Sequence, residues 1–125
     1  MTITHIKAVE APRFGEDGVE VFGHAAPSRG SGAVSAWRIR LAPGSGSPDH
    51  ELTTDQVFLA LTGEAEIAAD ATRVVLAPGD SATVPAGTTF RITGVGERPF
   101  EAVVVLPAGG EAIAGGERFT PPWAA

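Results

Sequence analysis

Apolar and polar residues alternate with a period of two in several short segments of this chain. Between residues 34 and 41, the apolar side chains of Trp37 and Ile39 fall on one face, whereas Arg38 and Arg40 fall on the other. In a β-strand, successive side chains point to opposite sides of the sheet. The alternation therefore predicts a half-buried strand over Val34–Leu41.

Other short segments, rich in valine and isoleucine, predict further strands. They are Thr2–Val9, Val19–His24, Gln56–Thr62, Ala65–Ala69, Arg73–Leu76, Ala82–Pro85, Thr89–Thr93 and Phe100–Leu106. Sixteen glycines and ten prolines separate them, as expected where tight turns join strands. Helix is nearly absent from the pattern, with at most one turn around Asp49–Thr54. We predict an all-β protein, with residues 1–125 forming a single domain.

The composition of the chain argues against several classes of function. The net charge is −6 and the lysines and arginines are not clustered, which argues against a nucleic-acid partner. The chain has no cysteine, so disulfides and thiolate metal sites are excluded. No apolar run is long enough to span a bilayer and no leader-like segment opens the chain. We expect a soluble cytoplasmic protein with no membrane partner.

Two segments carry the spacing of a metal-binding motif pair in which most ligand positions are replaced. The first motif, at residues 44–63, has the form G-x5-H-x-H-x3,4-E-x6-G and aligns with Gly44, His50, Leu52, Gln56 and Gly63. The second, at residues 79–94, has the form G-x5-P-x-G-x2-H-x3-N and aligns with Gly79, Pro85, Gly87, Phe90 and Gly94. In this spacing the chain resembles the cupin superfamily, whose fold is a double-stranded β-helix, a jelly-roll-like barrel.

The resemblance implies that the side chains of His50, Leu52, Gln56 and Phe90 point into the barrel mouth. Of the four usual ligands, only His50 is present. Leucine and phenylalanine donate nothing to a metal and a neutral amide is a weak ligand, whereas a stable site takes three or four donors. We therefore expect no metal and no other cofactor.

What remains is an apolar pocket for a small apolar organic ligand. We expect Trp37, Ile39, Leu52, Phe58 and Phe90 to line it as substrate-binding residues, although Trp37 also suits an ordinary core position. The candidate catalytic residues are His50, a base whose pKa burial would lower, and Gln56, which would polarise an oxygen. The alternative for His50 is a purely structural hydrogen bond.

Three functions stay open at this point. The resemblance includes metal-independent isomerases and cyclases, which favours proton transfer by His50 in an isomerase, cyclase or lyase. The alternatives are a non-catalytic ligand-binding module and, less favoured, a metal-dependent cupin enzyme.

The resemblance also implies a homodimer, in which Thr2–Val9 is a candidate for strand exchange. The segment Phe119–Trp123 either closes one end of the barrel or packs on a second subunit.

Overall fold

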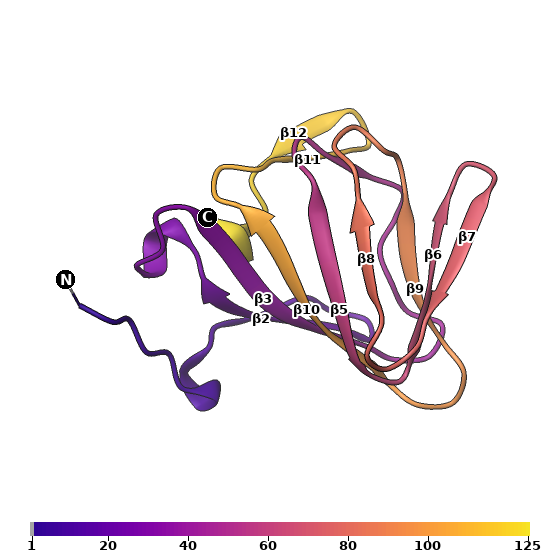
Figure 1. Cartoon of the computed structure of the whole chain (residues 1–125), viewed down its shortest axis with the longest axis horizontal. Coiled ribbons are helices and arrows are strands. Elements are labelled where there is room, and N and C mark those ends of the chain that lie inside the picture. Colours follow the sequence, from indigo (N-terminus) through magenta and orange to yellow (C-terminus); the bar gives the residue numbers. More distant parts are fainter. Residues whose placement is uncertain (1) are drawn as a thin grey trace.

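The larger sheet of the protein forms one wall of a barrel (Figure 1). The computed structural model describes residues 2–125. The sheet has six strands in the order β1-β2-β3-β10-β5-β8, and every neighbouring pair is antiparallel. The bounds are β1 Arg13–Phe14, β2 Val19–Ala25, β3 Val34–Leu41, β10 Phe100–Pro107, β5 Gln56–Thr62 and β8 Ser81–Val84.

Two three-stranded sheets, ordered β7-β6-β9 and β12-β11-β4, supply the opposite wall. Their bounds are β4 Glu51–Leu52, β6 Glu64–Ala69, β7 Thr72–Leu76, β9 Arg91–Val95, β11 Ala112–Ala114 and β12 Glu117–Phe119. Isolated bridges join Gly46 to Thr93 and His50 to Phe90, so the segment before β4 runs beside β9. Three short 3-10 helices complete the chain: η1 Ala8–Glu10, η2 Pro27–Arg29 and η3 Pro122–Ala124.

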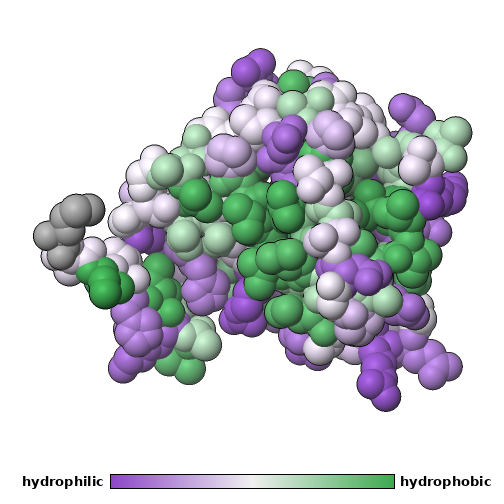
Figure 2. All heavy atoms as spheres, viewed as in Figure 1, coloured by the Kyte–Doolittle hydropathy of each residue, from purple (hydrophilic) through white to green (hydrophobic). Residues whose placement is uncertain are grey.

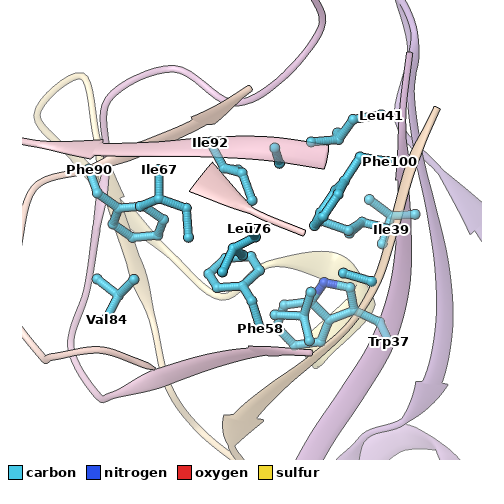
Figure 3. Packing of buried hydrophobic residues seen from close by; sticks show 14 of the residues in the cluster. Trp37, Ile39, Leu41, Phe58, Ile67, Leu76, Val84, Phe90, Ile92 and Phe100 are labelled. Carbon is cyan, nitrogen blue, oxygen red and sulfur yellow. The ribbon is translucent and has the colours of Figure 1, made fainter. Parts of the chain in front are cut away.

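The core lies between these walls (Figure 3). The alternation predicted for β3 is confirmed, because Trp37 and Ile39 are buried, whereas Arg38 stacks over the Phe22 ring at 4.8 Å on the outer face. Gly63, between β5 and β6, has a φ of 67°, and a Cβ atom there would collide with the carbonyl of Pro99. The turn therefore requires glycine.

The all-β prediction is confirmed, and β3 has the predicted bounds. Most other predicted strands shift by one or two residues at their ends. The strand at Thr2–Val9 is wrong: residues 2–7 form no strand, and η1 follows. Ile3 and Val9 are 91% and 92% exposed, so no sheet of the same chain buries these two side chains.

No helical turn forms around Asp49–Thr54, where at most one was expected, because this stretch pairs with Phe90 and with β11. The strands β1, β4, β11 and β12 were not predicted, since two or three residues are too few to show an alternation. Within residues 2–125, no helix has the length and apolar composition needed to cross a membrane.

Candidate ligand cavity

A cavity of about 250 Å³ lies inside the barrel, between the inner faces of β2, β3, β10 and β5 and the C-terminal part of the chain. Its walls are mostly aliphatic and aromatic. The lining residues are Val19, Val21, Trp37, Ile39, Leu41, Gly46, Ser47, Pro48, His50, Leu52, Gln56, Phe58, Ile92, Val104, Ala112, Ala114, Phe119, Pro121 and Trp123. None of them is an aspartate, glutamate, lysine or arginine.

The structure brings six of the seven predicted site residues to this cavity: Trp37, Ile39, His50, Leu52, Gln56 and Phe58. Phe90 does not line it. Its side chain is 1% exposed, and its ring centroid lies 4.4 Å from that of His50 and 6.1 Å from that of Phe58, edge to face with the latter. Phe90 thus supports His50 and Phe58 from behind rather than facing the cavity.

His50 is fixed by both its main chain and its ring. Its backbone exchanges two hydrogen bonds with Phe90, of 3.0 and 2.9 Å. Its Nδ1 lies 2.9 Å from the carbonyl oxygen of Pro48. A carbonyl only accepts, so Nδ1 carries the proton and the neutral ring presents Nε2 as a base.

Burial lowers the pKa of His50 from its ordinary value of 6.5, and the hydrogen bond to Pro48 and the charge of Asp49 oppose this effect. The net direction is downward, which keeps the imidazole neutral at neutral pH.

Gln56 opens β5 and is 5% exposed. Its Oε1 atom is buried, and no hydrogen-bond partner for it exists among the described residues. A buried acceptor without a partner costs free energy, typically about 1–3 kcal/mol, and therefore needs a physical explanation.

Trp123 closes the cavity from the C-terminal helix η3. Its indole packs against Phe14 and Trp37, with ring centroids 6.1 and 6.3 Å apart. The helix is held in place by Ser35 Oγ, which donates to the carbonyl of Ala124 at 2.7 Å, and by Arg29 Nη2, which donates to that of Trp123 at 2.6 Å. The C-terminal aromatic segment was expected either to close one end of the barrel or to pack on a second subunit. Trp123 packs against its own barrel.

The indole Nε1 of Trp123 is also buried, with no partner in residues 2–125. Only one other side-chain atom in that range shares this state, Thr54 Oγ1, and Thr54 does not line the cavity. Two of three unsatisfied buried polar atoms therefore belong to residues of one apolar cavity.

Sequence reasoning did not assign several lining residues to the site. Val19 and Val21 share the inner face of β2, and their two-residue spacing was a usable signal. Ala112 and Ala114 lie on β11, which is too short to reveal its faces from sequence.

A second hollow of about 590 Å³ lies between β7 and β8. Its lining mixes apolar residues with Thr72, Asp80, Ser81, Thr83 and Thr88, and it contains none of the predicted site residues. No unpartnered buried polar atom of the described chain belongs to a residue in its walls. The barrel cavity is therefore the better candidate, although it is smaller.

The residues at the cupin-like ligand positions do not suit a metal. Leu52 and Phe90 carry no donor atom, and within residues 2–125 no group of three or more histidine, cysteine, aspartate or glutamate side chains could hold an ion. Transition metals in proteins normally need such a set. The donor set at these positions therefore does not fit a transition-metal ion.

A sequence model of the cupin domain matches residues 37–106, a range that contains both motifs. The chain belongs to the cupin domain family. No curated protein has a sequence that matches it.

Solved structures agree with this assignment. A cupin superfamily protein from Desulfitobacterium hafniense is 27% identical, with a TM-score of 0.64 over 76% of this chain and 82% of that protein. The polyketide cyclase RemF from Streptomyces resistomycificus is 15% identical, with a TM-score of 0.74 over 97% of this chain and 83% of RemF. A cupin sugar phosphate isomerase from Silicibacter pomeroyi is 18% identical, with a TM-score of 0.73 over 90% of this chain and 82% of that one. At these identities the last two share the fold alone.

Proposed function

We propose that this cupin binds a small, uncharged, mostly apolar organic molecule in the barrel cavity. The observation that carries the proposal is the apolar cavity of about 250 Å³ with a few polar atoms in its walls, which is the usual composition of a small-molecule site. Its volume is slightly below the roughly 300–1,000 Å³ of sites for drug-sized ligands, which favours a ligand of one or two rings. Because no charged side chain lines the cavity, a phosphate or carboxylate would be buried without a counter-charge.

We further propose that His50 acts as a general base on this ligand. The neutral ring has Nε2 free to accept a proton from a carbon next to a carbonyl group, and the electron pair of the C–H bond then moves onto the carbonyl oxygen. Return of the proton to a different carbon gives an isomer, so the reaction needs no co-reactant. Gln56 is the proposed partner that holds and polarises the substrate through its amide.

Two similar structures are named as an isomerase and a cyclase, which supports rearrangement chemistry in this fold. Their substrates do not transfer to this chain. A sugar phosphate, for example, carries a charged group, and the cavity lining offers no cation to bind it.

Hydrogen–deuterium exchange of 2-tetralone in D2O tests the proposed base without knowledge of the natural substrate. This two-ring ketone has exchangeable protons next to its carbonyl, and proton NMR follows their loss. We expect the protein to accelerate exchange and His50→Gln to remove about 10²-fold or more of that acceleration, since a positioned base typically contributes 10²–10⁴-fold. The matched control is His24→Gln, because His24 does not line the cavity.

A non-catalytic binding module is the second candidate, and the fixed position of His50 favours it. Two backbone hydrogen bonds, the bond to Pro48 and the ring contact with Phe90 give this residue a structural role that needs no chemistry. Calorimetry with the same 2-tetralone separates the candidates. Binding without faster exchange would establish the module, and faster exchange that survives in His50→Gln would exclude His50 as the base.

Metal independence is proposed from the donor set and tested by elemental mass spectrometry. The protein is purified without a histidine tag, and the measurement is repeated after incubation with iron, manganese, nickel and zinc. We expect less than about a tenth of an ion per chain, because too few donors are present to retain one. Near-stoichiometric metal would overturn the proposal.

We also propose that a second copy of the chain is the protein partner. The N-terminal segment projects away from the barrel (Figure 1), with Ile3 and Val9 almost fully exposed. Pairing with another copy would bury these side chains. Light scattering after size exclusion should give twice the chain mass of 12.7 kDa, and removal of residues 2–10 should give the single mass. A full-length chain that elutes at the single mass would contradict this.

A further inference from the structure

We propose that a hollow between the N-terminal segment and η2 binds a phosphate group, either free or carried by a small molecule, and that Arg29, His24 and Arg38 hold it. This N-terminal hollow has a volume of about 540 Å³. Its polar lining residues are Thr2, Thr4, His5, His24, Arg29 and Ser31, and the described residues that line it include no aspartate or glutamate. It shares no lining residue with the barrel cavity, so the inference is independent of the proposed function.

Arg29 and Arg38 are half-buried, and within residues 2–125 neither forms an ion pair. Of the other six arginines, Arg98 is exposed, and five form ion pairs with side chains that are 49–62% exposed: Arg13, Arg40, Arg73, Arg91 and Arg118. A half-buried charge without a counter-charge costs free energy. The chain has fifteen aspartates and glutamates that could supply one, and the fold places none of them beside these two arginines. This arrangement favours an anion that comes from outside the chain.

Arg29 is fixed in place by the main chain. Its Nε donates to the carbonyl oxygen of His24 at 2.8 Å, and its Nη2 donates to that of Trp123 at 2.6 Å. Carbonyl groups satisfy these donors but leave the positive charge of the guanidinium without a counter-charge. The other N–H groups of the guanidinium lie in the same rigid plane, which suits two oxygens of one phosphate group.

His24 connects the two guanidinium groups. Nε of Arg38 lies 3.4 Å from Nε2 of the imidazole, a long contact, and its guanidinium lies over the ring of Phe22 at 4.8 Å. Because a guanidinium only donates, Nε2 accepts and the ring proton is on Nδ1. Burial lowers the pKa of His24, and the charges of Arg38 and Arg29 lower it further. Both positive charges therefore act on one side chain that lines the N-terminal hollow.

The composition of the N-terminal hollow favours one phosphate group over a larger polyanion. A guanidinium, an imidazole N–H and the hydroxyls of Thr2 and Thr4 can all donate, and phosphate oxygens are strong acceptors. One carboxylate is close, because Glu10 lines an adjoining hollow that also contains Arg29. Its Oε1 accepts from the main-chain N–H of Lys7 at 3.3 Å, and no ion pair joins it to Arg29 in the described chain. The charge of Glu10 opposes the binding of an anion with many charges.

Proton NMR with inorganic phosphate tests the site directly. The chain has three histidines, so its imidazole C–H signals are few, and replacing each histidine by glutamine in turn assigns them. At pH 7.5 and constant ionic strength, we expect phosphate to shift the signals of His24 to saturation and to leave those of His50 in place. A shift that does not saturate, or an equal response of both residues, would overturn the inference. Acetate that binds as tightly as phosphate would overturn the assignment to a phosphate group.

Variants that remove one positive charge each assign the site to its residues. Arg38→Gln and Arg29→Gln should each weaken phosphate binding by about tenfold, the usual effect of losing an interaction with a charged group. Arg73→Gln is the matched control, because Arg73 is exposed and pairs with Glu66 at 2.7 Å on a different sheet. It should change the affinity by less than about twofold, since distant exposed charges are screened by salt. Equal weakening by all three variants would overturn the inference.

Arg29 also holds η3 through Trp123, so thermal unfolding checks that Arg29→Gln is folded. Arg38 donates to no main-chain group in residues 2–125, and its variant alone decides the test if Arg29→Gln does not fold.

Two further measurements use the charges around His24. Sulfate has the shape of phosphate and a charge that does not change near neutral pH. It should raise the pKa of His24, because an anion favours the charged imidazole, and leave the pKa of His50 unchanged. Glu10→Gln should tighten phosphate binding, since it removes the carboxylate of the adjoining hollow. A pKa of His24 that sulfate does not raise, or a Glu10→Gln protein that binds phosphate more weakly than wild type, would contradict the inference.

Discussion

The two ends of the barrel interior differ in how completely they are filled. At the end closed by the β5–β6 turn, Phe100 is 0% exposed, and the small side chains of Ala60, Ala65 and Ala102 are buried on neighbouring strands. None of these residues borders the cavity. At the other end, two tryptophans and Phe58 surround an open volume of about 250 Å³. Large aromatic residues therefore border the hollow part of this core as well as filling the packed part.

The difference follows from where the large side chains point. Phe100 is fully buried and lies beside Ile39 and Leu41 in Figure 3. The indole of Trp123 instead approaches from the edge of the barrel, where it packs against Phe14 and Trp37. An aromatic ring at the rim encloses space that it does not fill. The cavity thus results from the placement of large side chains rather than from their number.

The first prediction compares two phenylalanines, Phe100→Ala and Phe58→Ala, by urea unfolding. Phe100 is packed on all sides, so its loss should cost about 3–5 kcal/mol of unfolding free energy. Phe58 borders the cavity and loses fewer contacts, so its replacement should cost about 3 kcal/mol or less even with its edge contact to Phe90. Equal costs would show that the two ends are packed alike.

The sequence predicted part of the wall of the hollow end. Alternation on β3 identified Trp37 and Ile39 as inward, and the motif spacing placed His50 and Gln56 correctly in the cavity. Alternating patterns show on which face of the sheet each side chain lies, and this is most of what determines the wall of a barrel.

The limits of that prediction lie in long-range packing. Phe90 occupies a motif position but lies behind His50, because the backbone pairing of these two residues brings their rings into a tilted contact. The sequence left open whether Trp123 closes one end of the barrel or packs on a second subunit, and its contacts with Trp37 and Phe14 show that it packs against its own barrel. Neither choice is encoded by local periodicity.

The outward orientation of some apolar residues is another feature that the sequence pattern did not reveal. Figure 2 shows apolar side chains gathered over the region of β10 and β5, and Leu59 and Leu61 are 44% and 50% exposed. The sequence presented this stretch as one apolar run, which does not reveal which residues face outward.

The second prediction adds bulk at each end, with Ala65→Leu and Ala112→Leu. Ala65 is 0% exposed and borders no cavity, so the larger side chain should cost about 1–3 kcal/mol through overpacking. Ala112 lines the cavity, so leucine can extend into open space with little cost or with a small gain in stability.

The same Ala112 variant should lose affinity for 2-tetralone by about tenfold or more, because its side chain would occupy the ligand's volume. Thermal unfolding measures the first effect and calorimetry the second. An Ala112→Leu protein that is destabilised as much as Ala65→Leu would contradict the proposed difference between the two ends.

The smallest expected effect is a pH dependence that belongs to the hollow end. Burial lowers the pKa of His50, whereas the unfolded chain titrates near the ordinary value of 6.5. The unfolded state therefore binds the proton more readily, and the stability contributed by the neutral ring is fully present above about pH 6.5 and lost as the pH falls through the lowered pKa. His24, whose pKa is lowered by partial burial and by the charges of Arg38 and Arg29, contributes in the same direction.

Urea unfolding between pH 7.5 and 5.5 should thus show a stability that falls as the pH falls, and His50→Asn should remove part of the slope while His24→Asn removes a separate part. Saturation with 2-tetralone should steepen the part due to His50, because a ligand in the cavity excludes water from the imidazole and disfavours its charge further. If the ligand leaves the slope of stability against pH unchanged, the His50 ring is not shielded from water by a ligand in the cavity. That result would contradict the contrast between a hollow end that titrates and a packed end that does not.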